Sequence, residues 1–480
     1  MLFNSLEFLI FLPVVFGLYW FAFKALRWQN LFVVVASYVF YGWWDWRFLL
    51  LIAFTTLCSY LSGLAIGQLE GNRRAQRAVS VANIVLNLLI LGVFKYYNFF
   101  VENLDALCAA CGFQLGWTAR NIILPVGISF YTFQALSYTI DVYRHKIPVA
   151  RDVVAFFAFV SFFPQLVAGP IERATNLLPQ FLKPRRFDYA RAVDGCRQML
   201  WGFFKKLVVA DNCALAVNAV WRDYASMPGS TLAVVAVLFA FQIYCDFSGY
   251  SDIAIGCARL FGIDLMRNFN VPYFSRNISE FWQRWHISLM TWFRDYIYFP
   301  LGGSRCGVSK TIRNTMIVFA ISGLWHGANW TYVCWGLYNG LLVSLGLLIG
   351  WKSADKRVVA AGRWLPSVKD ALQVLITFAL CCLGWIIFRA PDIHQAAGYV
   401  QHLFATLFTI GPMPWKKTCL FILLMVVVEW LQRDKQHALQ FASGSVLGRY
   451  RALRWAVYYA ILVVIVTCMG VSQTFIYFQF

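Results

Sequence analysis

The sequence predicts an all-α protein that crosses a membrane many times. Of its 480 residues, 60% are hydrophobic and only 13% are charged, whereas soluble domains carry about 25% charged residues. Apolar stretches that approach the ~20 residues needed to cross a bilayer recur along the whole chain. We therefore expect roughly 11–14 membrane-embedded helices, and we exclude a disordered chain, a disulfide scaffold and almost any soluble enzyme.

The candidate membrane helices are apolar runs bounded by polar or charged residues. In chain order they are Leu6–Phe23, Leu31–Tyr41, Phe48–Ile66, Val79–Phe94, Ile122–Ile140, Val153–Val167, Gln198–Val220, Leu232–Cys245, Thr311–Leu324, Tyr332–Ile349, Leu372–Phe388, Cys419–Val428 and Trp455–Val471. Several are short or contain Gly or Pro, so we expect some helices to be re-entrant or interfacial. No linker divides the chain, and we predict one membrane domain over residues 1–480.

Basic residues between these runs predict the orientation, because cytoplasmic loops are enriched in Lys and Arg. Three basic clusters are separated by two spans each. They are Lys24 and Arg27; Arg73, Arg74 and Arg77; and Arg144, Lys146 and Arg151. We place all three on the cytoplasmic side and the N-terminus outside. The formal net charge of +19 then reflects basic cytoplasmic loops, and we expect no nucleic-acid partner.

Two features that can indicate other classes are weak in this chain. The first apolar run lacks a preceding cationic region and a small-residue cleavage site, so we expect a retained helix rather than a signal peptide. Cys108 and Cys111 form a C-x-x-C, but a zinc site needs two further ligands at motif spacing and none is nearby. The other cysteines mostly lie singly in apolar runs, where they pack as small hydrophobes. We expect no metal.

The apolar pattern breaks down first at the segment from Asp246 to Asp252, DFSGYSD. A carboxylate near the middle of a bilayer costs about 2.5–3.5 kcal/mol on insertion scales, so it faces a cavity or a partner. Asp246 and Asp252 therefore either hold neighbouring helices together or line a polar path.

A second unusual segment runs from Asn277 to Asp295. Ser279 can cap a helix there, and Glu280 and Arg284 are four residues apart, so they can pair on one helix face. We predict an amphipathic helix at or in the membrane interface, carrying His286. A lone His on such a helix is either an ordinary interface residue or a functional one.

The third segment is Ser322 to Trp330, SGLWHGANW. Gly323 and Gly327 have a spacing that lets a helix or a ligand approach the backbone. Burial disfavours a charged imidazole, so we expect His326 to be neutral and able to take a proton from a hydroxyl. We further expect Asn329 to hydrogen-bond a ring nitrogen of His326 and so fix its tautomer. The alternative is a His that only packs between helices.

At these segments the chain resembles the membrane-bound O-acyltransferase family, in its bacterial alginate O-acetyltransferase branch. The resemblance covers nearly the whole chain. It rests on the opening LFNSLEFL and on LPVGISFYTFQ and FPQLVAGPI, which start at Leu2, Leu124 and Phe163. Its most specific pieces are Asp246–Asp252, FWQRWHIS from Phe281, and LWHG from Leu324.

The resemblance implies an acyltransferase whose helices enclose a tunnel. The His of the Trp-His-Gly motif, His326, would be the catalytic residue and general base. His286 would be the second functional position, which orients the hydroxyl or donates to the thioester carbonyl. The residues expected along the substrate tunnel are Arg284, Trp285, Trp325, Asn329, Asp246 and Asp252.

The resemblance further implies a cytosolic acyl-CoA donor, acetyl-CoA in particular, and no bound cofactor. The acceptor would be a hydroxyl of an exported, alginate-like polysaccharide, reached directly or through an extracytoplasmic partner acyltransferase. We expect the bacterial inner membrane, with lipid as the surrounding partner. A basic stretch such as Lys183, Arg185 and Arg186 is either an ordinary cytoplasmic loop or a contact for the phosphates of CoA.

Several functional classes remain compatible with the sequence. Asp246, Asp252 and the pair of Gly323 and Gly327 could instead line the path of an ion-coupled transporter or flippase in polysaccharide export. A purely structural scaffold of a secretion complex is a third class. Within the enzyme class, alginate, cellulose, peptidoglycan, another exopolysaccharide and, more distantly, D-alanyl transfer to teichoic acid remain candidates.

Overall fold

The computed structural model describes residues 1–113, 120, 122–351, 358–411, 415–442, 444–471 and 473–476. Within these ranges the regular structure is helical and no strand occurs, which confirms the predicted all-α class. By internal packing the chain forms two compact units. Unit 1 comprises residues 1–192 and 258–266, and unit 2 comprises residues 193–257 and 267–480. The single domain expected from the sequence stays a prediction.

Unit 1 is built from the first nine α-helices. Their bounds are α1 Leu6–Gly17, α2 Leu26–Gly42, α3 Arg47–Gln68, α4 Arg73–Leu91, α5 Tyr97–Ala110, α6 Ile128–Tyr143, α7 Val153–Ser161, α8 Phe163–Leu166 and α9 Ala174–Phe181. Two π-helical turns, η1 Leu18–Ala22 and η2 Gly92–Tyr96, continue α1 and join α4 to α5.

Unit 2 contains the remaining helices, of which α10 and α12 have one end in unit 1. Their bounds are α10 Tyr189–Phe203, η3 Phe204–Ala210, α11 Asp211–Trp221, η4 Tyr224–Ser226, α12 Gly229–Leu260, η5 Pro272–Phe274, α13 Ile278–Arg284, α14 Ile287–Phe293, η6 Arg294–Tyr298, α15 Val308–His326, α16 Trp330–Leu348, α17 Val368–Arg389, α18 Ile393–Ala405, α19 Lys416–Leu431, α20 Val446–Arg449 and α21 Arg451–Cys468.

Six helical segments in the described ranges are long and apolar enough to cross a membrane. They are α3, the continuous segment from α4 to α5, α12, α16, α17 and α21. Other predicted stretches form shorter or charged helices: the run expected at Ile122 becomes helical only at Ile128, and Gln198–Val220 is divided among α10, η3 and α11. The chain is thus a multi-pass membrane protein, while the total of embedded helices stays a prediction.

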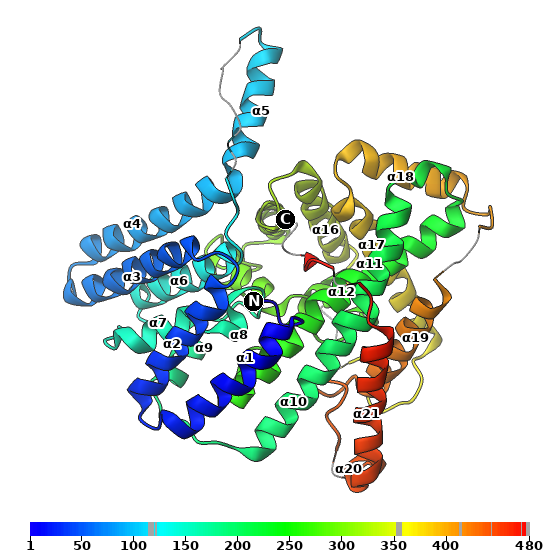
Figure 1. The fold of residues 1–480 in the computed structure, drawn as a ribbon. Helices are drawn as coiled ribbons and strands as arrows, with labels where there is room; N and C mark the ends of the chain where they lie inside the picture. The colour runs from blue at the N-terminus through cyan, green and yellow to red at the C-terminus, as the bar shows by residue number, and fades with distance from the viewer. Residues whose placement is uncertain are drawn as a thin grey trace. The chain divides into compact units, whose positions relative to one another are not determined.

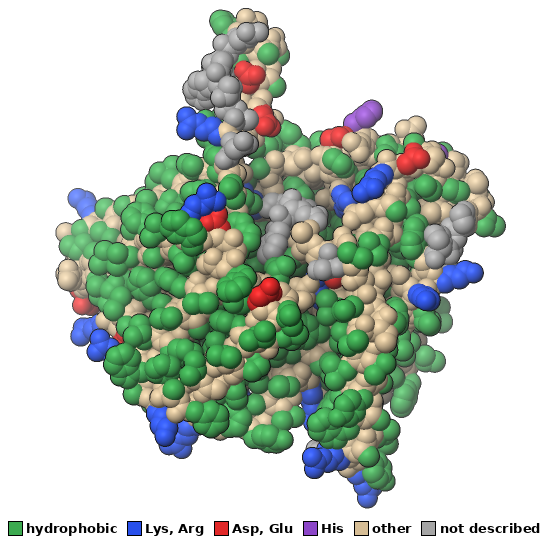
Figure 2. Space-filling view, in the orientation of Figure 1, with side chains coloured by type: hydrophobic (Ala, Val, Ile, Leu, Met, Phe, Trp, Pro, Cys, Tyr) green, Lys and Arg blue, Asp and Glu red, His purple; other side chains and the backbone are tan. Residues whose placement is uncertain are grey.

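The surface of the helices fits a lipid environment. Large apolar side chains such as Leu6, Leu9 and Ile10 of α1 are 59–70% exposed, and Val466 of α21 is 69% exposed. Figure 2 shows hydrophobic side chains over most of the visible face. Water would disfavour so much exposed apolar surface, whereas lipid tails do not.

The core of unit 1 surrounds α6, which packs on α3 and α4 (Figure 1). Asn83 of α4 donates from Nδ2 to Thr139 Oγ1 of α6 at 2.7 Å and to Ser59 Oγ of α3 at 3.3 Å. Small polar residues that bond across helices stabilise membrane bundles in this way. Arg73 donates to the backbone oxygen of Tyr143 at 2.7 Å, so the second and third basic clusters lie at the same end of these helices, as expected.

In unit 2, α15 and α16 pack together more extensively than other described pairs of helices. Glycines permit this approach: a Cβ added to Gly323 would lie 2.2 Å from the backbone oxygen of Tyr332, and one added to Gly336 would lie 2.2 Å from that of Phe319. The close approach expected at Gly323 is therefore confirmed. Since α15 ends at His326, this crossing sets the position of that residue.

We predict that Gly336→Ala destabilises the protein by about 1–3 kcal/mol, because the methyl group would overlap backbone that cannot move independently. Gly346→Ala is the matched control on the same helix, since its Cβ would make only an ordinary 3.4 Å contact with the Trp351 side chain. Reversible unfolding of the detergent-solubilised variants measures the difference. Equal stability of the two variants would contradict the tight crossing.

Candidate active site

His286 lies at a break between two short helices rather than within one amphipathic helix. The helix expected over Asn277–Asp295 divides into α13 and α14, and His286 precedes α14 with φ 45° and ψ 51°. Asn277, and not Ser279, caps α13 by accepting the N–H of Glu280 at 2.8 Å. A left-handed backbone is costly for a residue with a side chain, and such conformations concentrate at functional sites.

Backbone hydrogen bonds to the segment around Asn268 and Asn270 stabilise the break between α13 and α14. The N–H of Ile287 donates to the backbone oxygen of Asn268 at 2.9 Å, and the N–H of Asn270 donates to that of Arg284 at 2.9 Å. The next residue, Val271, also has a positive φ of 40°. These contacts replace the hydrogen bonds that a continuous helix would make here, so the strain at His286 is compensated locally.

The side chain of Asn268 assigns the tautomer of His286. Its Oδ1 accepts from Ser288 Oγ at 2.9 Å and from the N–H of Ser288 at 3.3 Å, which identifies that atom as oxygen. His286 Nδ1 lies 3.1 Å from the same oxygen and must therefore carry the proton. Burial lowers the pKa of His286 to about 3. The ring is neutral at pH 7, with its lone pair on Nε2.

His326 ends α15 inside a cage of aromatic rings. Its side chain is buried, and its ring centroid lies 4.9 Å from that of Trp325, 5.1 Å from that of Trp335 and 5.4 Å from that of Phe388. The Trp325 ring also lies 5.9 Å from the His286 ring. The two predicted histidines are thus neighbours of one tryptophan, and both are buried.

The expected bond between Asn329 and His326 is wrong. Asn329 caps α16 by accepting the N–H of Thr331 at 3.0 Å, and its Nδ2 donates to the backbone oxygen of Pro391 at 2.8 Å. Asn is a favoured residue at the start of a helix, and this local role uses both ends of the amide. Asn329 therefore positions the turn after His326 rather than the imidazole itself.

Asp246 and Asp252 do not line the large cavity described below; they are ion-paired within the protein. Asp246 lies 2.8 Å from Lys206 Nζ and accepts the N–H of Ile476 at 2.7 Å, and Asp252 lies 2.6 Å from Lys205 Nζ. These contacts join α12 to η3 and to the segment 473–476. The arrangement matches the structural alternative, in which carboxylates hold elements together, while their assignment to a substrate path stays a prediction.

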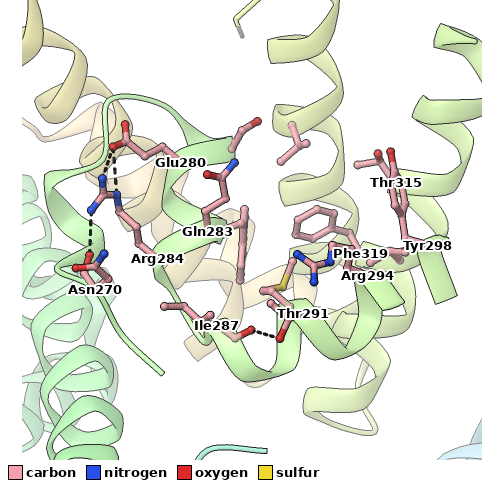
Figure 3. Close-up of a pocket in the computed structure, with 15 residues that line it drawn as sticks. Asn270, Glu280, Gln283, Arg284, Ile287, Thr291, Arg294, Tyr298, Thr315 and Phe319 are labelled. Carbon is pink, nitrogen blue, oxygen red and sulfur yellow. Dashed lines mark hydrogen bonds and ion pairs between the residues drawn. The ribbon is translucent and has the colours of Figure 1, made fainter. Parts of the chain in front are cut away.

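A cavity of about 650 Å³ in unit 2 lies beside the break (Figure 3). Arg284, Ile287, Thr291 and Arg294 contribute to its wall. Arg284 is held by Glu280, with Nη2 2.8 Å from Oε1, which confirms the predicted pair. Arg284 and Ile287, which flank the break, thus face the cavity, while Trp285 and His286 are not among the described residues that line it.

A layer of aromatic rings separates this cavity from His326. Trp282 lines the cavity, and its ring lies 5.5 Å from that of Trp335, which in turn contacts His326. Trp285, predicted to line a tunnel, packs in the core against Phe281 at 5.4 Å and Trp385 at 4.9 Å, and its place along a tunnel stays a prediction. Of the residues expected along a tunnel, Arg284 alone is among the described residues lining this cavity.

Asn268 and the two lysines of η3 were not predicted from the sequence. Asn268 lies 18 residues before His286 in an irregular segment, where no spacing rule connects the two. Lys205 and Lys206, however, stand in an otherwise apolar run. Charges in such a run require buried partners, so their pairing with Asp246 and Asp252 was open to prediction.

We predict that Asn268→Ala lowers the free energy of unfolding by about 1–3 kcal/mol, because it leaves buried donors of Ser288 and His286 without an acceptor. Asn339→Ala is the matched control, since Asn339 is also buried but donates only to the backbone of its own helix, at 2.8 Å to Trp335 O. Chemical unfolding in detergent compares them. A smaller loss for Asn268→Ala than for Asn339→Ala would refute the bracing role.

Comparison with known proteins shows the family. The family model of MBOAT, the membrane-bound O-acyltransferase family, matches residues 38–386. "Probable alginate O-acetylase AlgI" of Pseudomonas aeruginosa is 41% identical over 406 residues, which are 84% of this chain and 75% of the relative. The peptidoglycan O-acetyltransferase of Helicobacter pylori is 34% identical over 82% of this chain and 78% of its own length.

A more distant relative is named for the transfer of another acyl group, D-alanyl. The teichoic acid D-alanyltransferase of Bacillus subtilis is 29% identical over 58% of this chain and 71% of its own length. The family match includes the break at His286 and the end of α15 at His326. This chain belongs to the membrane-bound O-acyltransferase family and is an O-acyltransferase.

Proposed function

We propose that this enzyme transfers an acetyl group from cytosolic acetyl-CoA to a hydroxyl of an exported polysaccharide at the bacterial inner membrane. The acceptor is reached directly or through an extracytoplasmic partner acyltransferase. One observation carries the proposal: two buried imidazoles, one of them assigned as neutral by its hydrogen bonds, both lie next to Trp325. Such groups suit proton transfer from an alcohol to a base.

In this proposal His326 is the general base. Its imidazole takes the proton from the acceptor hydroxyl while the oxygen attacks the thioester carbonyl carbon. The C–S bond then breaks, and the CoA thiolate leaves with the proton that His326 had taken. Because a thioester is already activated, the enzyme mainly has to activate the hydroxyl and hold the reactants together, and a positioned base contributes about 10²–10⁴-fold.

For His286 the hydrogen bonds favour an accepting role. Its Nδ1–H is directed to Asn268, and its lowered pKa of about 3 disfavours a second proton at neutral pH. Of the two expected roles, orienting the hydroxyl fits this state, whereas donation to the thioester carbonyl requires a proton on Nε2. His286 then holds the acceptor hydroxyl through Nε2 while His326 removes the proton.

The cavity beside the break is suited to receive one of the two substrates. It is bounded by polar groups, including Arg284, Gln283 and Thr291 (Figure 3). Trp282 also lines it. Movement of Trp282 and Trp335 would connect it to His326. We propose that these rings form the inner end of the substrate path and exclude water while it is closed.

The transporter alternative loses its main support in the structure. It required Asp246 and Asp252 to face a translocation path, but both are held by lysines within the protein. The acceptor remains a choice among the polymers named for the relatives: alginate, peptidoglycan and teichoic acid. Two of these three relatives are named for O-acetyl transfer, which supports acetyl over D-alanyl as the acyl group.

We predict that His326→Ala lowers acetyl transfer by about 10²–10⁴-fold, because the hydroxyl loses its base. The measurement follows radiolabelled acetyl from acetyl-CoA to polysaccharide acceptors, or to a partner acyltransferase, with purified protein in proteoliposomes. His394→Ala is the control, since that His is exposed at the start of α18 and belongs neither to the aromatic rings around His326 nor to the lining of the cavity.

Three results distinguish the alternatives. Loss of transfer in His326→Ala with normal folding supports the enzyme mechanism. Transfer that persists in this variant excludes His326 as the base, and a simultaneous loss of polysaccharide flux would instead indicate the transporter. If both His326→Ala and His286→Ala keep full transfer and export, the chain serves these reactions as a scaffold.

A further inference from the structure

Unit 1 contains an open basic pocket that the transfer reaction does not explain. Its volume is about 710 Å³, and it lies between the end of α9 and the start of α10, with Gly262 at its edge. Four cationic side chains line it, against one carboxylate among its described lining residues. The cations are Lys183, Arg185, Arg186 and Arg191, and the carboxylate is Asp188.

The guanidinium of Arg185 is held in a fixed position by its neighbours. Its Nη2 donates to Asn30 Oδ1 at 2.5 Å, and Asn30 is itself oriented by donating to the backbone oxygen of Phe181 at 2.8 Å. The guanidinium also lies over the rings of Tyr19 and Phe181, at 5.5 and 5.4 Å from their centroids. Such contacts pre-organise the planar fork of an arginine, which reduces the entropy lost on binding an anion.

The two carboxylates near the pocket, Asp188 and Asp264, already have hydrogen-bond or ion-pair partners. Asp188 Oδ1 accepts the N–H groups of Ala190 at 2.9 Å and Arg191 at 3.1 Å, at the start of α10. Asp264 pairs with Arg191 at 2.8 Å. These carboxylates therefore neutralise at most the Arg191 side of the pocket.

The cationic groups of Arg185, Lys183 and Arg186 are not fully paired within the described part of the chain. Within the described chain, Arg185 Nε and Nη1 are buried without a hydrogen-bond partner. Lys183 and Arg186 are exposed and form no ion pair within the described ranges. Buried donors without partners are unfavourable, and several cations facing one space repel one another. A multiply charged anion would satisfy both requirements.

We propose that this pocket binds a phosphate-bearing ligand through Arg185, Arg186 and Lys183. Planar guanidinium groups match phosphate oxygens in paired hydrogen bonds, and a lysine adds a point charge. The ligand is either a soluble cytosolic phosphate ester or the phosphate headgroup of a lipid. Exposed Phe187 and Tyr189 border the pocket, as aromatic residues do at a membrane interface, so both sources need testing.

The test measures binding, so its outcome does not depend on the proposed acetyl transfer. Full-length protein in a neutral detergent is titrated with inorganic pyrophosphate by calorimetry. We expect Arg186→Gln and Lys183→Gln each to weaken binding about tenfold or more, because each removes a charged contact to the anion. Both residues are exposed, so these variants keep the fold even if Arg185→Gln does not. Lys24→Gln, which removes an exposed cation outside the pocket, should leave binding unchanged.

A second measurement identifies the source of the phosphate. Nanodiscs containing phosphatidylglycerol are compared with nanodiscs of phosphatidylcholine alone, each with pyrophosphate as the probe. Loss of pyrophosphate binding only in phosphatidylglycerol supports a lipid headgroup as the ligand, and equal binding in both supports a soluble phosphate. Absence of pyrophosphate binding in detergent and in phosphatidylcholine would overturn the proposal. So would binding that the variants Arg186→Gln and Lys183→Gln do not weaken.

Discussion

A polar group inside an apolar chain must find its partner within the same protein, and this constraint shapes unit 2. Lys205 and Lys206 are paired with Asp252 and Asp246, and Arg284 is paired with Glu280. Leaving one member of such a pair alone would strand a buried charge, at a cost of about 3–5 kcal/mol. These ion pairs therefore help to fix the positions of η3, α12 and α13. The candidate site lies at the break between α13 and α14.

The same constraint explains how the surroundings of His286 fix the protonation state of its imidazole. A histidine inside a continuous helix would direct its ring wherever the helix face allowed. The break between α13 and α14 instead presents the Nδ1–H of His286 to one oxygen of Asn268, which also accepts from Ser288. The resulting tautomer leaves Nε2 as an acceptor. The strained backbone at His286 is thus tied to a defined protonation state, which a general acid–base site requires.

What could be predicted from the sequence depended on local spacing. The membrane class follows from composition, the pair of Glu280 and Arg284 from their separation of four residues, and the close approach at Gly323 from its small side chain. The break at His286 could not be predicted in this way, because it depends on backbone contacts with Asn268 and Asn270. Asn329 was misassigned for a related reason: its nearness to His326 along the chain favoured a contact, but helix capping uses the amide elsewhere.

The most direct test of the account is a structure of the enzyme with a non-hydrolysable thioether analogue of acetyl-CoA and a hydroxyl acceptor. We predict that the acceptor oxygen lies within hydrogen-bond reach, about 2.6–3.2 Å, of His326 and of His286 Nε2, with the carbonyl carbon of the analogue beside it. The path to the cavity lined by Arg284 should then be open past Trp282. A reacting carbonyl placed away from both imidazoles would contradict the central claim.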